Sequence, residues 1–182
     1  MPSEIVSVEE LIDGGLAWLL AAGRRVDDGL VWAETAAGDQ PDFSLYAGSA
    51  GIVVTLLEGH RHTKRQEAGD AALQGARAIA AAIGTMENAS LYGGLTGCAF
   101  ALHAVDTILG DSACGQAALR ALDIVRSKFD GERWAEEFEL LFGNAGVALG
   151  ALAISRRSGA GQRFLAALNI SKFGLSAFIL IP

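Results

Sequence analysis

The sequence predicts an all-α fold built from repeated helical hairpins, and three observations support this prediction. The 182-residue chain contains only 3 prolines and is rich in alanine and leucine, which favour helices. A nine-residue motif occurs three times at nearly constant spacing. The segments that follow the motifs carry their apolar residues at the 3.6-residue period of an α-helix.

The repeated motif has the pattern x-Leu-[Tyr/Leu]-x-Gly-x-x-Gly-apolar and occupies residues 44–52, 90–98 and 139–147. The first glycines of the three copies are Gly48, Gly94 and Gly143, at spacings of 94 − 48 = 46 and 143 − 94 = 49 residues. The second glycines are Gly51, Gly97 and Gly146. We expect all six to be structural, because glycine allows either a close approach of two backbones or a positive φ.

Each motif precedes a run that is apolar on almost every side, over residues 52–57, 98–105 and 147–154. A helix that is apolar all round is a buried helix. Residues 67–83 and 113–129 instead carry one apolar stripe opposite their charges, which predicts half-exposed helices.

The segment before the first motif fits the same plan. Ser7 and Glu10 have the spacing of a capping box at a helix start. The apolar stripe that follows predicts another outer helix, and its members are Val8, Leu11, Ile12, Leu16, Leu19 and Leu20.

Alternating buried and half-exposed helices predict a two-layer wall, because a hairpin cannot bury its inner helix alone and must stack against its neighbours. An α/α toroid and an open solenoid both satisfy this pattern. The apolar inner helices favour the toroid, since an open solenoid usually exposes a polar concave face.

Charge and composition exclude several classes of protein. The net charge of −7 argues against a nucleic-acid partner, which normally calls for a basic face. No apolar stretch reaches the roughly 20 residues that a membrane-spanning helix needs, and the N-terminus has no signal-peptide pattern. Two cysteines do not make a disulfide framework, so we expect a cytoplasmic protein.

The three motif copies resemble the glycine-rich repeats of lanthionine-synthetase-C-like proteins, and Ala99 to His103 continue the match after the second copy. The resemblance implies a ring of six helical hairpins around a central cavity. The chain holds about three of them and is therefore predicted to be the N-terminal half of the family's domain, an incomplete α/α toroid. We assign residues 1–168 to this partial domain and residues 169–182 to a divergent apolar tail.

The family's cyclases bind zinc through two cysteines and a histidine from later repeats. The zinc activates a substrate thiol, which adds to a dehydroalanine or dehydrobutyrine to form a thioether. The Trp-Cys and Cys-His-Gly motifs that supply these ligands are absent from this sequence. The expected function is therefore peptide modification in lanthipeptide biosynthesis, with a peptide substrate. This chain would contribute an N-terminal portion that binds no cofactor itself and is inactive alone.

Glu139 is the candidate catalytic residue, because the resemblance places a carboxylate at this position of the third repeat, facing the cavity. Its implied role is general acid/base chemistry on the enolate formed by thiolate addition. The alternative is a partner of the helix dipole or a solvated charge.

Metal-ligand spacing is missing around the remaining candidates, so no metal site is predicted. Cys98 takes an apolar core position, Cys114 opens an outer helix, and His103 lies in a buried run. His60 and His62 lie near the end of an inner helix and complement its dipole. Tyr46 and Tyr92 are expected to pack between neighbouring hairpins, with lining of the cavity as the alternative.

Other functions are compatible with the same pattern. The chain could be a non-catalytic peptide-binding remnant or half of a split toroid. Its two open edges then predict self-association or pairing with a separate C-terminal half. A glycoside-processing six-hairpin toroid is disfavoured because it needs a pair of carboxylates, and Glu139 has no convincing partner in the sequence.

Overall fold

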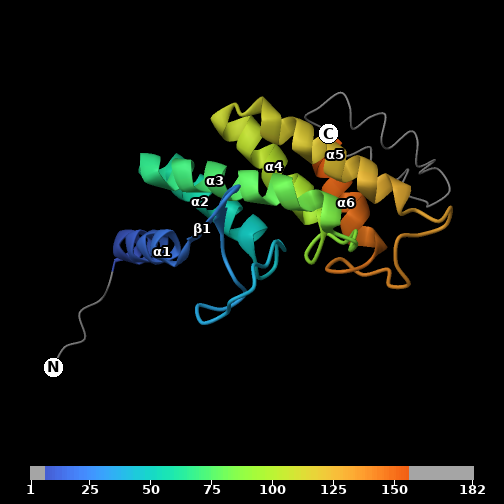
Figure 1. Cartoon of the computed structure of the whole chain (residues 1–182), viewed down its shortest axis with the longest axis horizontal. Coiled ribbons are helices and arrows are strands. Elements are labelled where there is room, and N and C mark those ends of the chain that lie inside the picture. Colours follow the sequence, from blue (N-terminus) through green and yellow to red (C-terminus); the bar gives the residue numbers. More distant parts are fainter. Residues whose placement is uncertain (1–6, 156–182) are drawn as a thin grey trace.

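The computed structural model describes residues 7–155 and confirms the all-α prediction (Figure 1). Its elements in chain order are α1 (Val8–Ala22), β1 (Arg24–Val26), β2 (Gly29–Val31), α2 (Ser49–Thr63), α3 (Gln66–Ala82), a short 3-10 helix (Ile83–Thr85), α4 (Leu95–Leu109), α5 (Ser112–Ser127) and α6 (Asn144–Ser155). Among these residues no helix is long and apolar enough to cross a membrane.

The helices form two layers that follow the predicted alternation. The helices that begin directly after the first motif glycines form the inner layer, where α4 lies between α2 and α6 and contacts both. The outer layer contains α3 and α5, which contact each other and cover α2 and α4 (Figure 1). The wall is therefore present over the described residues, and its closure into a toroid stays a prediction.

Small residues hold the two layers close together. The face of α3 that meets the inner layer carries Ala68, Ala72 and Ala76, all completely buried. Larger side chains such as Leu56 and Leu102 come from the inner helices and fill the space between the layers. This division explains why alanine is so abundant, since large side chains on both layers would push them apart.

Helix α1 only partly follows its predicted stripe. The capping box is present: Glu10 N donates to Ser7 Oγ, and Ser7 N donates to a Glu10 carboxylate oxygen. Leu16 is buried against Gly59 of α2. Val8 and Leu11 are 67% and 63% exposed, so the stripe was predicted wrongly at these two positions. The reason is that the core ends at the second half of this helix.

A two-stranded antiparallel hairpin follows α1 and was not predicted from the sequence. Val26 pairs with Gly29 across the turn, and Gly29 has a φ of 145°. This glycine lies against the backbone of Gln74 in α3, where a side chain would collide. The chain then reaches Trp32, a buried residue whose indole N–H donates to Leu19 O at 2.9 Å. The hairpin and the segment after it thereby connect α1 to the outer helix α3.

Candidate functional site

The three motif copies lie side by side and form a ladder of loops at the N-terminal ends of the inner helices. Tyr46 N donates to Tyr92 O at 3.0 Å, and Tyr92 N donates to Leu141 O at 3.0 Å. These three residues occupy the same position in their motifs. The rings of Tyr46 and Tyr92 meet edge to face, with centroids 6.3 Å apart. They pack between neighbouring hairpins, as the sequence predicted.

The first motif glycines allow each loop to fold back onto its own backbone. Gly48 and Gly94 are the N-caps of α2 and α4, and Gly143 directly precedes α6. A Cβ at these positions would collide with the carbonyl six residues earlier, on Asp42, Asn88 or Glu137.

The second motif glycines serve a similar purpose one turn later. A Cβ at Gly51, Gly97 or Gly146 would meet the carbonyl of the motif leucine, again six residues earlier. Of the two explanations for glycine, close backbone approach therefore applies, because none of the six motif glycines has a positive φ.

A side chain at the first position of each motif fixes the turn that follows. Ala47 N donates to Ser44 Oγ at 3.1 Å, and Gly93 N donates to Ser90 Oγ at 3.1 Å. In the third copy Glu139 takes this role, and Phe142 N donates to its Oε1 at 2.6 Å. The three loops thus share one local hydrogen bond despite the change from serine to glutamate.

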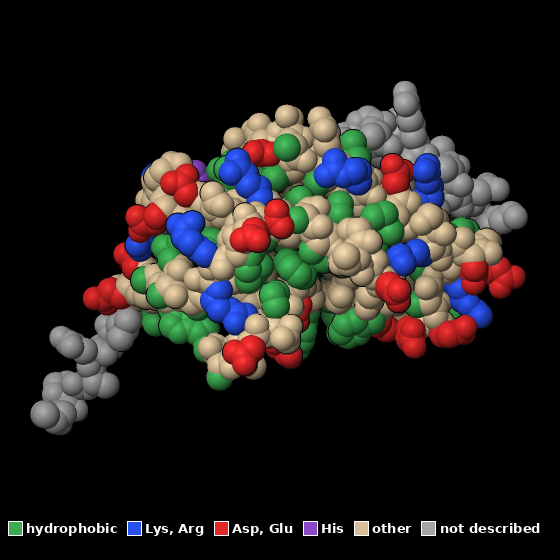
Figure 2. Space-filling model, in the orientation of Figure 1, with side chains coloured by type: hydrophobic (Ala, Val, Ile, Leu, Met, Phe, Trp, Pro, Cys, Tyr) green, Lys and Arg blue, Asp and Glu red, His purple; other side chains and the backbone are tan. Residues whose placement is uncertain are grey.

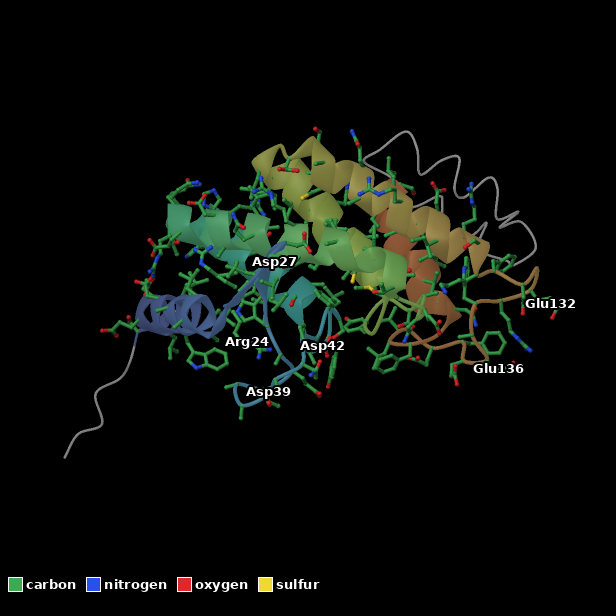
Figure 3. All side chains as sticks on the ribbon, viewed as in Figure 1. Arg24, Asp27, Asp39, Asp42, Glu132 and Glu136 are labelled. Carbon is green, nitrogen blue, oxygen red and sulfur yellow. The ribbon has the colours of Figure 1, made fainter. Side chains whose placement is uncertain are left out.

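Glu139 makes a second contact that the two serines do not make. Its Oε2 accepts from Leu141 N at 2.5 Å, the N–H group equivalent to those that link the first two loops to their neighbours. The residue is exposed and stands in an acidic surface with Glu132, Glu136 and Glu137. Figure 3 labels two of these carboxylates on the loop between α5 and α6, and Figure 2 shows acidic side chains gathered at this end.

Asn144 holds this third loop in place, and sequence reasoning missed it. Its Oδ1 accepts from Trp134 N at 2.8 Å, while its Nδ2 donates to Ala135 O and Glu137 O at 2.7 and 2.6 Å. The signal that could have identified it is the asparagine directly after the first glycine of the third motif, where the first two copies carry serine and leucine. The acidic loop therefore has a defined path next to Glu139.

Both cysteines are buried and suited to a structural role. Cys98 Sγ donates to Phe43 O at 3.2 Å, and burial, with the nearby charge of Asp42, raises the pKa of its thiol to about 12. Burial and the charge of Asp111 raise the pKa of the Cys114 thiol to about 12 as well. A metal-binding or nucleophilic cysteine needs the opposite shift, because the thiolate is its reactive form.

The histidines lie apart from the loop ladder. His60 Nδ1 lies 2.9 Å from Arg65 O at the end of α2, and His62 is exposed nearby. His103 is half-buried and lines a hollow of about 690 Å³ on the surface of the inner layer. Glu58 and Arg61 line the same hollow and form an ion pair at 2.8 Å.

Glu139 does not line this hollow. Ala153 is the residue of α6 that lines it, and Asn144 begins that helix. A separation of nine residues corresponds to about 14 Å along a helix axis. The hollow and the loop ladder are therefore at opposite ends of the inner helices.

The described residues offer no ligand set for the zinc that the resemblance implies. Within residues 7–155 no three side chains of histidine, cysteine, aspartate or glutamate are grouped closely enough to hold a metal ion. The raised thiol pKa values agree with this geometry. The predicted apolar tail, residues 169–182, lies outside the described residues.

Comparison with known proteins bears directly on the repeats. Neither a curated protein nor a solved structure matches the sequence. The family model described as lanthionine synthetase C-like protein matches residues 39–169, which is 169 − 39 + 1 = 131 of the 182 residues. The matched region includes all three motifs and the helices α2 to α6, and it excludes α1. The chain belongs to the lanthionine synthetase C-like family.

Proposed function

We propose that this chain contributes to peptide modification of the lanthionine synthetase C type, as three hairpins of the α/α toroid of a thioether-forming cyclase. Membership of the family is the observation that carries this proposal. The loop ladder supports it, because three equivalent loops at one end of the inner helices give a surface along which a peptide can lie. Glu139 presents an exposed carboxylate on the third of these loops.

The proposed reaction joins a cysteine thiolate of the substrate to the β-carbon of a dehydroalanine or dehydrobutyrine. The new S–C bond forms as the electron pair of the C=C bond moves to the α-carbon, and the resulting enolate must then receive a proton. We assign that proton transfer to Glu139: its carboxylate takes up the proton that the substrate thiol releases and then donates this proton to the α-carbon. Because the described residues hold no ligand set for zinc, we assign this chain no step that involves a metal.

The geometry of Glu139 is suited to proton transfer. Two backbone N–H groups fix its carboxylate, one on each oxygen. An ionised carboxylate offers about four lone-pair positions, so each oxygen keeps one for a substrate proton. A group held in this way loses little freedom when it acts, which is an advantage for a general acid or base.

The test is thioether formation on a peptide with one cysteine and one dehydroalanine, measured as the loss of free thiol. Because the chain is expected to be inactive alone, it is supplied together with the later, zinc-binding repeats of a family cyclase. We expect Glu139→Gln to lower the rate above background by about 10²–10⁴-fold, the usual contribution of general acid/base catalysis. The matched control is Glu137→Gln, which neutralises an exposed carboxylate of the same loop.

Glu139→Ser separates catalysis from loop structure. Serine occupies this position in the first two motifs and makes the same turn hydrogen bond there. The serine variant should therefore keep the turn, lose only the bond from Leu141 N, and still lose the activity. A rate unaffected by either Glu139 variant would contradict the assignment of Glu139.

A non-catalytic peptide-binding module is the second candidate, and exposed apolar side chains favour it. Phe138 and Phe142 in the third loop and Leu149 in α6 are 80%, 49% and 51% exposed. In the first candidate they would contact a further hairpin, and in the second they would contact a bound peptide or another chain. Peptide binding without any rate acceleration would support the second candidate, whereas the absence of both would refute both.

A further inference from the structure

A cavity of about 420 Å³ lies beside the first loop of the ladder, and the proposed chemistry does not use it. It is enclosed by the end of α1, the start of β1, the segment after β2, the first motif loop and the start of α2. Its volume is within the range of ligand-binding sites in proteins.

Arg24 is the one basic residue among those that line this cavity. It is half-buried at the start of β1, and Figure 3 shows it between α1 and the loop that carries Asp39. Within residues 7–155 its Nη2 atom is buried and has no hydrogen-bond partner. A buried donor on a charged group without a partner costs stability, so an acceptor that pairs with this guanidinium would stabilise it.

Aromatic side chains form much of the remaining wall. Trp18 and Tyr46 are 60% and 71% exposed, and Trp32 is buried behind them. Trp32 is held by its hydrogen bond to Leu19 O and by Trp32 N, which donates to Ser49 Oγ at 3.1 Å. Tryptophan, tyrosine and arginine are the residue types that are enriched among those contributing most to binding at protein interfaces.

The lining of the cavity has no net charge, which disfavours a ligand of high charge. Glu34 also lines the cavity, so the lining carries one basic and one acidic side chain. A carboxylate can pair with the guanidinium through two parallel hydrogen bonds. A phosphate group carries nearly twice the charge at neutral pH, and Glu34 would repel it more strongly.

We propose that this cavity binds an acidic residue of a peptide, with its carboxylate on Arg24 and a neighbouring apolar side chain against Trp18 and Tyr46. The inference rests on the proposed function in one respect, namely that the peptide is the substrate that continues along the loop ladder. Tyr46 connects the two places, because it lines the cavity and also forms the first rung of the ladder. The cavity would anchor the substrate at a distance from Glu139.

The test is a titration of the full chain with the peptide acetyl-Leu-Phe-Glu-Ala-amide, followed through the NMR signals of the three tryptophan indole N–H groups. We expect the signals of Trp18 and Trp32 to shift in a saturable manner. Trp134 should not respond, because its indole N–H donates to Val125 O at 2.8 Å in another part of the fold. The peptide with glutamine in place of glutamate should bind at least tenfold more weakly.

Arg24→Gln should weaken binding of the glutamate peptide at least tenfold, and Arg24→Lys should recover only part of it because an ammonium group cannot form two parallel bonds. Arg25→Gln is the matched control. Arg25 is exposed and follows Arg24 in β1, so its side chain points to the opposite face of the strand. Inorganic phosphate should bind more weakly than the peptide.

Three results would overturn the proposal. These are equal binding of the glutamine peptide, equal loss of binding in the Arg25 variant, and tighter binding of phosphate. The readout does not depend on thioether formation. Binding at Arg24 without cyclisation would therefore refute the proposed reaction alone, and cyclisation without this binding would refute the anchor site alone.

Discussion

Replacing Gly94 with alanine tests the claim that close backbone approach, and not backbone conformation, requires glycine in the motif. Gly94 has a φ of −150°, which alanine adopts without strain. The added Cβ would lie 2.7 Å from the Asn88 carbonyl carbon and closer still to its oxygen. Ordinary contact begins at 3.4 Å, so the loop must move by 3.4 − 2.7 = 0.7 Å or more.

That movement acts on the bond between Leu95 N and Asn88 O, which is 2.8 Å long and connects the loop to the first turn of α4. Loss of such a bond costs about 1 kcal/mol. Overpacking of a filled site adds about 1–3 kcal/mol. We therefore expect Gly94→Ala to lower the free energy of unfolding by about 2–4 kcal/mol, measured by urea denaturation with circular dichroism.

The matched control is Gly15→Ala in α1, where an added Cβ has no neighbour within 4 Å. Alanine is the better helix former there, so this variant should gain up to about 1 kcal/mol. A loss of less than about 0.5 kcal/mol for Gly94→Ala would refute the steric explanation and, with it, the stated reason for the motif.

Two further predictions concern the buried thiol and the exposed edge. The pKa of the Cys98 thiol is raised from 9.0 to about 12 in the folded chain, so the stability that the neutral thiol contributes is complete below pH 9 and is lost as the pH rises towards 12. In urea titrations at increasing alkaline pH, the free energy of unfolding of the wild type should therefore fall relative to that of Cys98→Ala. Parallel pH dependence of the two proteins would contradict this prediction. Sedimentation should show concentration-dependent association that Phe138→Ser and Leu149→Ser together weaken, and a single monomer at all concentrations would exclude association.

The helical wall was predictable because its signals are local. The spacing of Gly48, Gly94 and Gly143, and the apolar runs behind them, report periodicity within short segments. The β-hairpin was not predictable with the same ease. Asp28 and Gly29 give a turn signal, but the contact that requires glycine there comes from Gln74, 45 residues away by 74 − 29.

The candidate site was predictable to a lesser extent. The motif alignment places Glu139 at the first position of the third copy, and the family resemblance made it the candidate; its catalytic role stays a prediction. The cavity around Arg24 could not be predicted, since it unites α1, β1 and the first motif loop. The position of His103 was also misjudged. A buried run predicted a core histidine, whereas the residue is half-buried on the rim of a hollow because the inner layer has no cover at that point within residues 7–155.

The ladder itself accounts for the change from serine to glutamate in the third motif. The N–H groups of Tyr46 and Tyr92 are satisfied by the carbonyl of the next loop. Leu141 N has the equivalent position, and among the described residues its acceptor is the carboxylate of Glu139. A serine at position 139 is too short to reach this group while also fixing the turn. Both carboxylate oxygens of the glutamate therefore accept hydrogen bonds from the loop backbone. A proton-transfer role would need the fixed geometry that results. The loop structure and the proposed chemistry thus both require a carboxylate at position 139 that is held in one orientation.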